Sequence, residues 1–312
     1  MSKLFLIIFI GLAVIMIALA VVNAKTRSAL APFDEQAQSL APFDYITLSH
    51  GPVHYRWQGP EDGPVVVMVH GFSTPMFIFE QNAEALIAAG YRVLRFDHFG
   101  RGWSARPNAA YDRDFYDTTL LELLDQLAPA TPIHLMGLSM GGIISAEFAA
   151  RHPERVRSLA LFVPAGLDIQ DMGFAGQLVK IPILGTYIWN KRVIPSFKTA
   201  PKQDDVPPSH RLQGDVAVQY GYRGTSEALR QTLLNLPMSG QDDRFRAVAA
   251  HQIPTLAIFG ADDLTVPISS AGRLAEAMPE AQIEVIAGGE HTVNFDHFPE
   301  VNAILMKWIK QR

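Results

Sequence analysis

The short segment from Gly137 to Gly141 constrains the fold more strongly than any other part of the sequence. It reads Gly-Leu-Ser-Met-Gly, with an apolar run before it (132–136) and small residues at helical spacing after it (142–150). This order predicts a strand, a sharp turn and a helix, with Ser139 at the apex. Gly137 and Gly141 suit the turn because strand and helix backbones approach closely there. A serine exposed in this way predicts acyl chemistry, although so short a pattern also fits a turn that only connects two elements.

A second strand is predicted to end at the same place. The run Val65–Val69 is uniformly apolar, as is typical of a parallel strand buried on both faces, and it leads into His70-Gly71-Phe72. A backbone N–H group in this turn is the expected second donor to an oxyanion formed beside Ser139.

These residues, together with the segment Asp97-His98-Phe99-Gly100-Arg101-Gly102-Trp103-Ser104, carry a resemblance to a known family. From about residue 43 to residue 312, the chain resembles an α/β-hydrolase. The resemblance implies an α/β fold in which helices flank a mostly parallel central sheet and a helical cap is inserted. It also implies that a catalytic acid and then a histidine follow the serine in the chain.

The acid is expected at the end of a later strand. Residues 253–259 have the composition of a strand, and they lead into Gly260-Ala261-Asp262-Asp263. The Gly-x-x-Asp spacing usual in the family selects Asp263 rather than Asp262.

The histidine is expected after the next strand, 283–287, which ends in Gly288-Gly289-Glu290-His291. His291 and His297 are the histidines that follow Asp263, and His291 has the position of the family's base. His297 is interpreted as a residue at the start of the last helix. A metal site made of Glu290, His291, Asp296 and His297 is disfavoured because the spacing fits no zinc motif.

The resemblance also implies the roles of these groups. His291 would take the proton of Ser139, Asp263 would orient the imidazole, and the backbone N–H groups of Phe72 and Met140 would form the oxyanion hole. No cofactor is expected, since no dinucleotide-binding or phosphate-binding glycine motif is present. Haloalkane dehalogenases and most epoxide hydrolases of this fold have an aspartate at the nucleophile position, so Ser139 argues against those activities.

Composition narrows the choice of partners. The chain has 312 residues, is 48% hydrophobic and carries a net charge of −5, so it has no basic excess for nucleic acid. It has no cysteine. Disulfides, thiolate metal sites and a cysteine nucleophile are therefore excluded.

Residues 1–27 are predicted to be a separate unit. The run Leu4–Val22 is uncharged and almost wholly apolar, and as a helix it would be about 28 Å long, which matches the hydrocarbon core of a bilayer. An uncleaved membrane anchor is the preferred interpretation. Cleavage after Ala24, as in a signal peptide, stays open. Lys3 and the amino terminus lie on one side of the run and Lys25 and Arg27 on the other, so charge favours neither orientation. The similarity to an export signal favours an extracytoplasmic catalytic domain.

The remaining chain is divided by composition. Residues 28–44 contain Leu-Ala-Pro-Phe-Asp twice and are predicted to be a semi-extended linker. A first core segment is expected over 45–164, opened by a hairpin of 45–49 and 53–58. The stretch 165–237 is too long for a loop and is expected to be the helical cap, with 198–211 as an outer loop. The core then resumes over 238–312.

The leading functional hypothesis is a serine esterase or lipase for small-molecule, lipophilic esters, similar to monoacylglycerol lipase-like members of the family. Membrane anchoring and the apolar cap motivate the lipid preference. The first alternative is a carbon–carbon bond hydrolase of the meta-cleavage type, in which Arg101, Arg223 or Arg230 would hold a substrate carboxylate. The second is a catalytically silent binding protein. The fold alone does not name the substrate.

Overall fold

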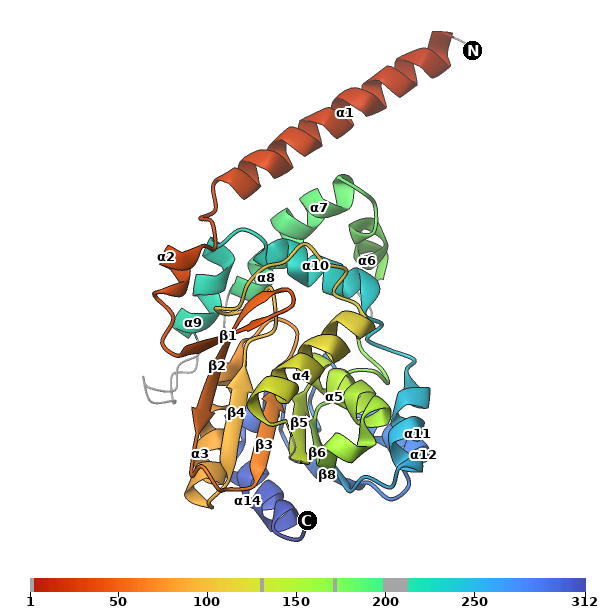
Figure 1. Cartoon of the computed structure of the whole chain (residues 1–312). Helices are drawn as coiled ribbons and strands as arrows, with labels where there is room; N and C mark the ends of the chain where they lie inside the picture. The colour runs from red at the N-terminus through yellow and green to blue at the C-terminus, as the bar shows by residue number, and fades with distance from the viewer. Residues whose placement is uncertain (1–2, 130–131, 171–172, 199–212) are drawn as a thin grey trace.

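The computed structural model describes residues 3–129, 132–170, 173–198 and 213–312. Within these ranges the chain forms an eight-stranded sheet in the order β1-β2-β4-β3-β5-β6-β7-β8 (Figure 1). The strands are β1 Asp44–Leu48, β2 Gly51–Gln58, β3 Val65–Val69, β4 Arg92–Phe96, β5 Ile133–Leu138, β6 Val156–Phe162, β7 Thr255–Gly260 and β8 Gln282–Ile286.

The sheet is mostly parallel, as the resemblance implied. β2 pairs antiparallel with both β1 and β4, whereas every pairing from β4 through β8 is parallel. The predicted opening hairpin is confirmed as β1 and β2. The parallel strands therefore present their carboxyl ends along one edge of the sheet, which is where functional residues of such folds gather.

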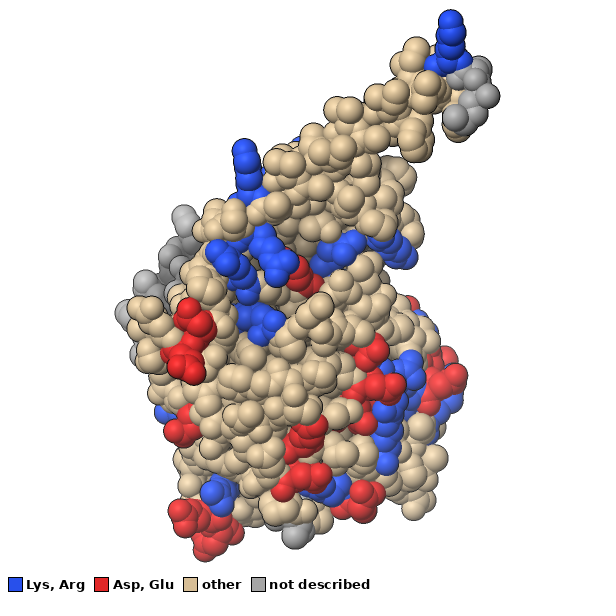
Figure 2. Space-filling model, turned by 45° about the horizontal axis from the view of Figure 1, so that its top comes forward, with Lys and Arg blue, Asp and Glu red and all other residues tan. Residues whose placement is uncertain are grey.

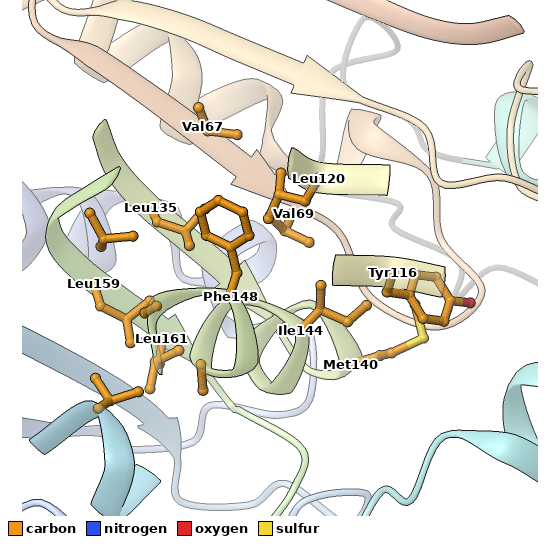
Figure 3. Packing of buried hydrophobic residues seen from close by; sticks show 14 of the residues in the cluster. Val67, Val69, Tyr116, Leu120, Leu135, Met140, Ile144, Phe148, Leu159 and Leu161 are labelled. Carbon is orange, nitrogen blue, oxygen red and sulfur yellow. The ribbon is translucent and has the colours of Figure 1, made fainter. Parts of the chain in front are cut away.

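Helices cover both faces of the sheet because successive strand residues point to opposite sides. In β3, Val67 packs into one core and Val66 into the other. Figure 3 shows Val67, Leu135 and Leu159 of three strands packed against Phe148. The first face is covered by α4 Arg113–Leu127, α5 Met140–Arg151, α11 Asp242–Ala250 and α12 Ser269–Ala277. The second is covered by α3 Glu80–Ala88, α13 Val293–Asp296 and α14 Phe298–Ile309.

Short helices lie between β6 and β7, inside the range expected for the cap. They pack around their own apolar cluster, in which Val179, Trp189, Tyr220 and Leu229 are buried. The predicted outer loop 198–211 lies outside the described residues apart from Lys198. The cap helices are α6 Gly173–Val179, α7 Leu184–Ile188, α8 Ile194–Lys198, α9 Gln213–Val218 and α10 Thr225–Asn235.

The amino-terminal helix α1, Lys3–Ser28, projects from the cap side of the molecule (Figure 1). It is longer than the apolar run that predicted it. The linker prediction was wrong in part, since α2, Glu35–Gln38, forms within it. The reason is local: the Asp34 carboxylate accepts the Ala37 N–H group at 3.1 Å, which caps a helical turn.

Candidate active site

Ser139 lies on a strained turn between β5 and α5. Its backbone has φ 53° and ψ −117°, an unusual conformation for a residue with a side chain. The flanking glycines make the turn possible. A Cβ atom on Gly137 would collide with the Gly141 carbonyl, and one on Gly141 would collide with the Val69 carbonyl at the end of β3. The turn therefore brings β3, β5 and the first turn of α5 together around Ser139.

The structure brings Ser139, His291 and Asp263 into one hydrogen-bonded chain. His291 Nε2 lies 3.0 Å from Ser139 Oγ, and His291 Nδ1 lies 2.8 Å from Asp263 Oδ2. The other oxygen of Asp263 accepts the backbone N–H groups of Thr265 and Val266 at 2.7 and 2.9 Å. Asp262, the alternative acid, is exposed to solvent.

This hydrogen-bond pattern fixes the direction of each bond. An ionised carboxylate only accepts hydrogen bonds, so the His291 proton is on Nδ1 and points to Asp263. Nε2 then presents a lone pair to the Ser139 hydroxyl, which donates to it. The arrangement is that of a serine whose proton can be taken by the imidazole.

The two expected oxyanion donors lie beside the serine. Phe72 and Met140 both line the same pocket as Ser139 and His291. Met140 is the first residue of α5, so its N–H group has no acceptor within the helix. The Phe72 N–H group donates to no backbone acceptor among the described residues.

His70 and Gly71, which precede Phe72, are held rigidly. The buried His70 ring accepts the His98 N–H group at Nε2, 2.9 Å away, so its Nδ1–H donates to the Gly71 carbonyl at 2.9 Å. Burial lowers the pKa of His70 to about 4, which keeps the ring neutral at pH 7. The neutral ring thus fixes the tautomer and the shape of the loop that presents Phe72.

Sequence reasoning assigned no role to a second Asp–His pair close to this loop. His54 Nδ1 donates to Asp97 Oδ2 at 2.8 Å, and both side chains are fully buried. Asp97 also accepts the N–H groups of Met76 and Trp103, each at 3.0 Å. The sequence signal for this pair is the segment from Asp97 to Ser104, which carries part of the family resemblance.

A pocket of about 780 Å³ opens beside Ser139, between the sheet and the cap. Its wall is largely apolar, with Phe72, Leu138 and Met140 from the core and Trp189, Val193 and Phe197 from the cap. The volume suits a small molecule with an acyl-sized apolar part.

The three arginines considered as carboxylate ligands do not line this pocket. Arg101 is buried and donates to the Phe72 carbonyl at 3.1 Å and to Thr232 Oγ1 at 2.7 Å. Arg223 donates to the Leu30 carbonyl and Arg230 to the Val179 carbonyl, both at 2.8 Å. Among the described residues, no three His, Asp or Glu side chains are grouped as a metal ion would require.

Two relatives are similar to most of the chain. Lipase 1 of Psychrobacter immobilis is 28% identical over 265 residues, which cover 83% of this chain and 79% of the lipase. A 2-hydroxy-6-oxononadienedioate/2-hydroxy-6-oxononatrienedioate hydrolase of Cupriavidus pinatubonensis is 27% identical over 284 residues, which cover 85% of this chain and 94% of that enzyme.

The fold is also found in a solved structure, a bromoperoxidase from Bacillus anthracis. It has a TM-score of 0.71 and 22% identity, and the match covers 86% of this chain and 99% of that one. Residues 64–298 match a family described as alpha/beta hydrolase fold. This match runs from the start of β3 to the start of α14 and takes in the serine turn, the cap and both later strand ends. The chain therefore belongs to the alpha/beta hydrolase fold family, as a hydrolase.

Proposed function

We propose that the protein is a serine hydrolase that cleaves lipophilic carboxylic esters, such as monoacylglycerols or medium-chain acyl esters. The observation that carries the proposal is the hydrogen-bonded chain from Asp263 through His291 to Ser139, which ends in a largely apolar pocket. The similarity to Lipase 1 of Psychrobacter immobilis agrees with it.

In the proposed reaction, Ser139 Oγ attacks the ester carbonyl while His291 Nε2 takes its proton. Asp263 stabilises the imidazolium that forms. Collapse of the tetrahedral intermediate breaks the bond to the alcohol oxygen, which receives the proton from His291. Water then attacks the acyl-enzyme with the same proton transfers and releases the acid. Ser139, His291 and Asp263 are thus the proposed catalytic residues, and the cycle uses no cofactor.

The backbone N–H groups of Phe72 and Met140 are the proposed oxyanion hole. Both flank Ser139 in the pocket, and a donor of this type is worth about 3–4 kcal/mol of transition-state stabilisation. Gly137 and Gly141 support the hole because their lack of a side chain lets the two backbones approach. His70 and Gly71 support it by holding the loop that presents Phe72.

We also propose that residues 4–22 anchor the chain in a membrane, with the catalytic domain on the extracytoplasmic side. α1 is long and apolar enough to cross a bilayer, and none of its most apolar window is buried in the protein. The mass of the membrane-bound protein tests the anchor against signal cleavage, because an uncleaved anchor retains residues 1–24. Addition of protease to intact cells tests on which side of the membrane the catalytic domain lies.

A carbon–carbon bond hydrolase is the second candidate, favoured by the similarity to the Cupriavidus pinatubonensis enzyme. Arg101, Arg223 and Arg230 lie outside the described pocket wall, so the carboxylate ligands expected for this activity are not there. Lys180 lines the described pocket and would have to hold the dienoate carboxylate instead. A silent binding protein is disfavoured by the complete Asp–His–Ser chain.

The test is fluorophosphonate labelling of the full chain in detergent, with mass mapping and a series of p-nitrophenyl esters of increasing acyl length. We expect an adduct on Ser139 and a rate optimum at one acyl length. Ser139→Ala should abolish both and leave folding intact. Labelling without ester turnover would favour the carbon–carbon hydrolase. A folded protein that is not labelled would favour the binding protein.

A further inference from the structure

We propose that the α6–α7 corner of the cap docks into the same bilayer as α1, so that the pocket receives its lipid substrate from the membrane. The docking rests on the proposed membrane anchor. The identity of the substrate rests on the proposed esterase function, and the experiments below separate the two.

The first observation is the length of α1. The helix has 26 residues and is about 39 Å long, whereas the hydrocarbon core of a bilayer is about 30 Å thick. Its apolar run ends at Val22 and polar residues follow from Asn23 to Ser28. The last turns of α1 therefore lie at the level of the lipid headgroups.

The cap is attached to α1 at this level. Asn23 Nδ2 donates to the Ile183 carbonyl at 3.0 Å, just before α7. Arg27 lies 3.7 Å from the Glu227 carboxylate of α10. Arg223 donates to the Leu30 carbonyl at 2.8 Å. These contacts fix the cap to the end of the helix that leaves the membrane.

The contact continues along the apolar part of α1. α1 packs against α7, as Figure 1 shows, and half-buried residues follow one side of α1 at helical spacing: Met16, Leu19, Asn23 and Thr26. Met16 lies about 10 Å along the helix axis from Asn23, toward the membrane centre. Part of the α6–α7 corner therefore reaches below the headgroup level when α1 spans the bilayer.

The surface of this corner suits that environment. Phe174 of α6 is 78% exposed, and Ile181 and Ile183 in the connection to α7 are 40% and 36% exposed. Exposed large apolar side chains mark an interaction site, and Ile183 lies beside α1, since its carbonyl accepts the hydrogen bond from Asn23.

Basic side chains surround the junction. Figure 2 shows Lys and Arg gathered where α1 meets the cap. The exposed residues Lys25, Arg27, Lys191 and Arg192 come from α1 and from the π-helix Trp189–Val193 that follows α7. Apolar surfaces that are bordered by basic side chains bind anionic membranes. The apolar side chains insert into the bilayer and the basic ones attract the anionic headgroups. The occupant of the surface is therefore a lipid bilayer that contains anionic headgroups.

The pocket reaches this corner of the cap. Gly176 and Gln177 of α6 and Lys180 just after it line the pocket, and Gln177 and Lys180 are also exposed to solvent. The pocket therefore opens at the surface beside α6, the short helix that also carries the exposed Phe174. An acyl chain passing around α6 would move from the bilayer to Ser139 without crossing water.

The docking is tested on full chains in anionic vesicles that contain doxyl-labelled lipid. The natural sequence has no cysteine, so single-cysteine variants carry one fluorophore each. Ile10→Cys on α1 is the anchor control. Phe174→Cys and Ile181→Cys test the cap, and Gln311→Cys, beside the carboxyl terminus at the opposite pole in Figure 1, is the solvent control.

We expect doxyl lipid to quench the label at 10, 174 and 181 several-fold more than the label at 311. Quenching at 10 but not at 174 or 181 would overturn the docking and leave the anchor standing. No quenching at 10 would overturn both. These readouts need no enzymatic activity, so failure of the esterase proposal cannot be confused with failure of the docking.

Entry of the substrate from the membrane is tested with Phe174→Asp and Ile181→Asp, alone and together. Neither residue is in the described pocket wall. The double variant should hydrolyse an ester embedded in vesicles roughly tenfold more slowly, since apolar insertion drives such binding. Its rate on a short water-soluble ester should be unchanged. Equal rates on the embedded ester for wild type and variant would overturn membrane loading. If the wild type cleaves neither ester, the proposed function is wrong, and the quenching result still decides the docking.

Discussion

The molecule contains two Asp–His pairs with nearly the same local geometry and different surroundings. In each, a histidine Nδ1 lies 2.8 Å from a carboxylate Oδ2, and the carboxylate also accepts two backbone N–H groups. His54 is fully buried beside Asp97, whereas the His291 side chain is 30% exposed beside the pocket.

The difference lies at the second ring nitrogen. His291 Nε2 meets Ser139 Oγ, but His54 Nε2 has no hydrogen-bond partner among the described residues, and the ring stacks on Phe43 at 5.6 Å. The two pairs therefore differ in what the imidazole reaches: a serine hydroxyl and a cavity at His291, and neither of these at His54 among the described residues. The same pair sealed in the core is a stabilising contact between β2 and the loop after β4.

The largest expected effect comes from Asp263→Asn. The amide would turn its NH₂ group toward His291, because its oxygen is held by the N–H groups of Thr265 and Val266. The His291 proton would then move to Nε2, which could no longer accept the Ser139 proton. We expect kcat to fall about 10⁴-fold with little change in folding. Steady-state ester hydrolysis with a urea unfolding curve checks this, and a loss below tenfold would contradict the role of Asp263.

The matched substitution in the other pair, Asp97→Asn, should act on stability instead. Both oxygens of Asp97 accept hydrogen bonds only, so either orientation of the amide sets its NH₂ group against a donor. We expect the free energy of unfolding to fall by about 3–5 kcal/mol, with kcat per labelled Ser139 nearly unchanged. A large loss of kcat in the folded, fluorophosphonate-titrated fraction would show that the two pairs are not separable.

Acid tests the comparison further, because a third histidine, His70 in the loop after β3, is buried and has no carboxylate hydrogen-bond partner among the described residues. Burial lowers the pKa of His70 to about 4, so between pH 4 and 6.5 the unfolded chain binds a proton that the folded chain does not. Stability is therefore complete above pH 6.5 and falls on acidification. From pH 7 to pH 5 His70 should contribute a loss of about 2 kcal/mol. Burial also lowers the pKa of His98 and of His134, so these rings add to the loss. Urea unfolding at both pH values measures the sum, and a pH-independent midpoint would refute the buried neutral state of these histidines.

The smallest effect is expected at His297, the other histidine after Asp263. It precedes α14 and makes no side-chain cap hydrogen bond. His297→Ala should change kcat less than twofold and the free energy of unfolding by less than about 0.5 kcal/mol. His291→Ala is the matched control and should nearly abolish turnover. A severe effect at His297 with a mild one at His291 would reassign the base.

Much of the fold and the candidate site was predictable because the sequence signals for it lie within short segments. The glycines at 137 and 141 predicted the serine turn, and the Gly-x-x-Asp spacing selected Asp263, which the structure places beside His291. The uniform apolar run Val65–Val69 predicted a buried strand, found as β3. Each signal works because a backbone conformation or a burial pattern within a few residues allows few side chains.

Other features depended on residues far apart in the chain. Arg101 was considered as a carboxylate ligand, but its guanidinium is held by the Phe72 carbonyl and Thr232. The His54–Asp97 pair joins β2 to the loop after β4, and neither residue carries a local signal for the other.

The sequence by itself determined which serine, which acid and which histidine stand at strand ends. In a parallel sheet these strand ends share one edge. Only the tertiary structure decided which cap residues line the pocket, where α1 meets the cap and which Asp–His pair faces a serine hydroxyl. The reason is that short cap helices, with little sequence periodicity of their own, take their positions from packing against distant segments. What a histidine can do depends on the group that this packing places at its second nitrogen.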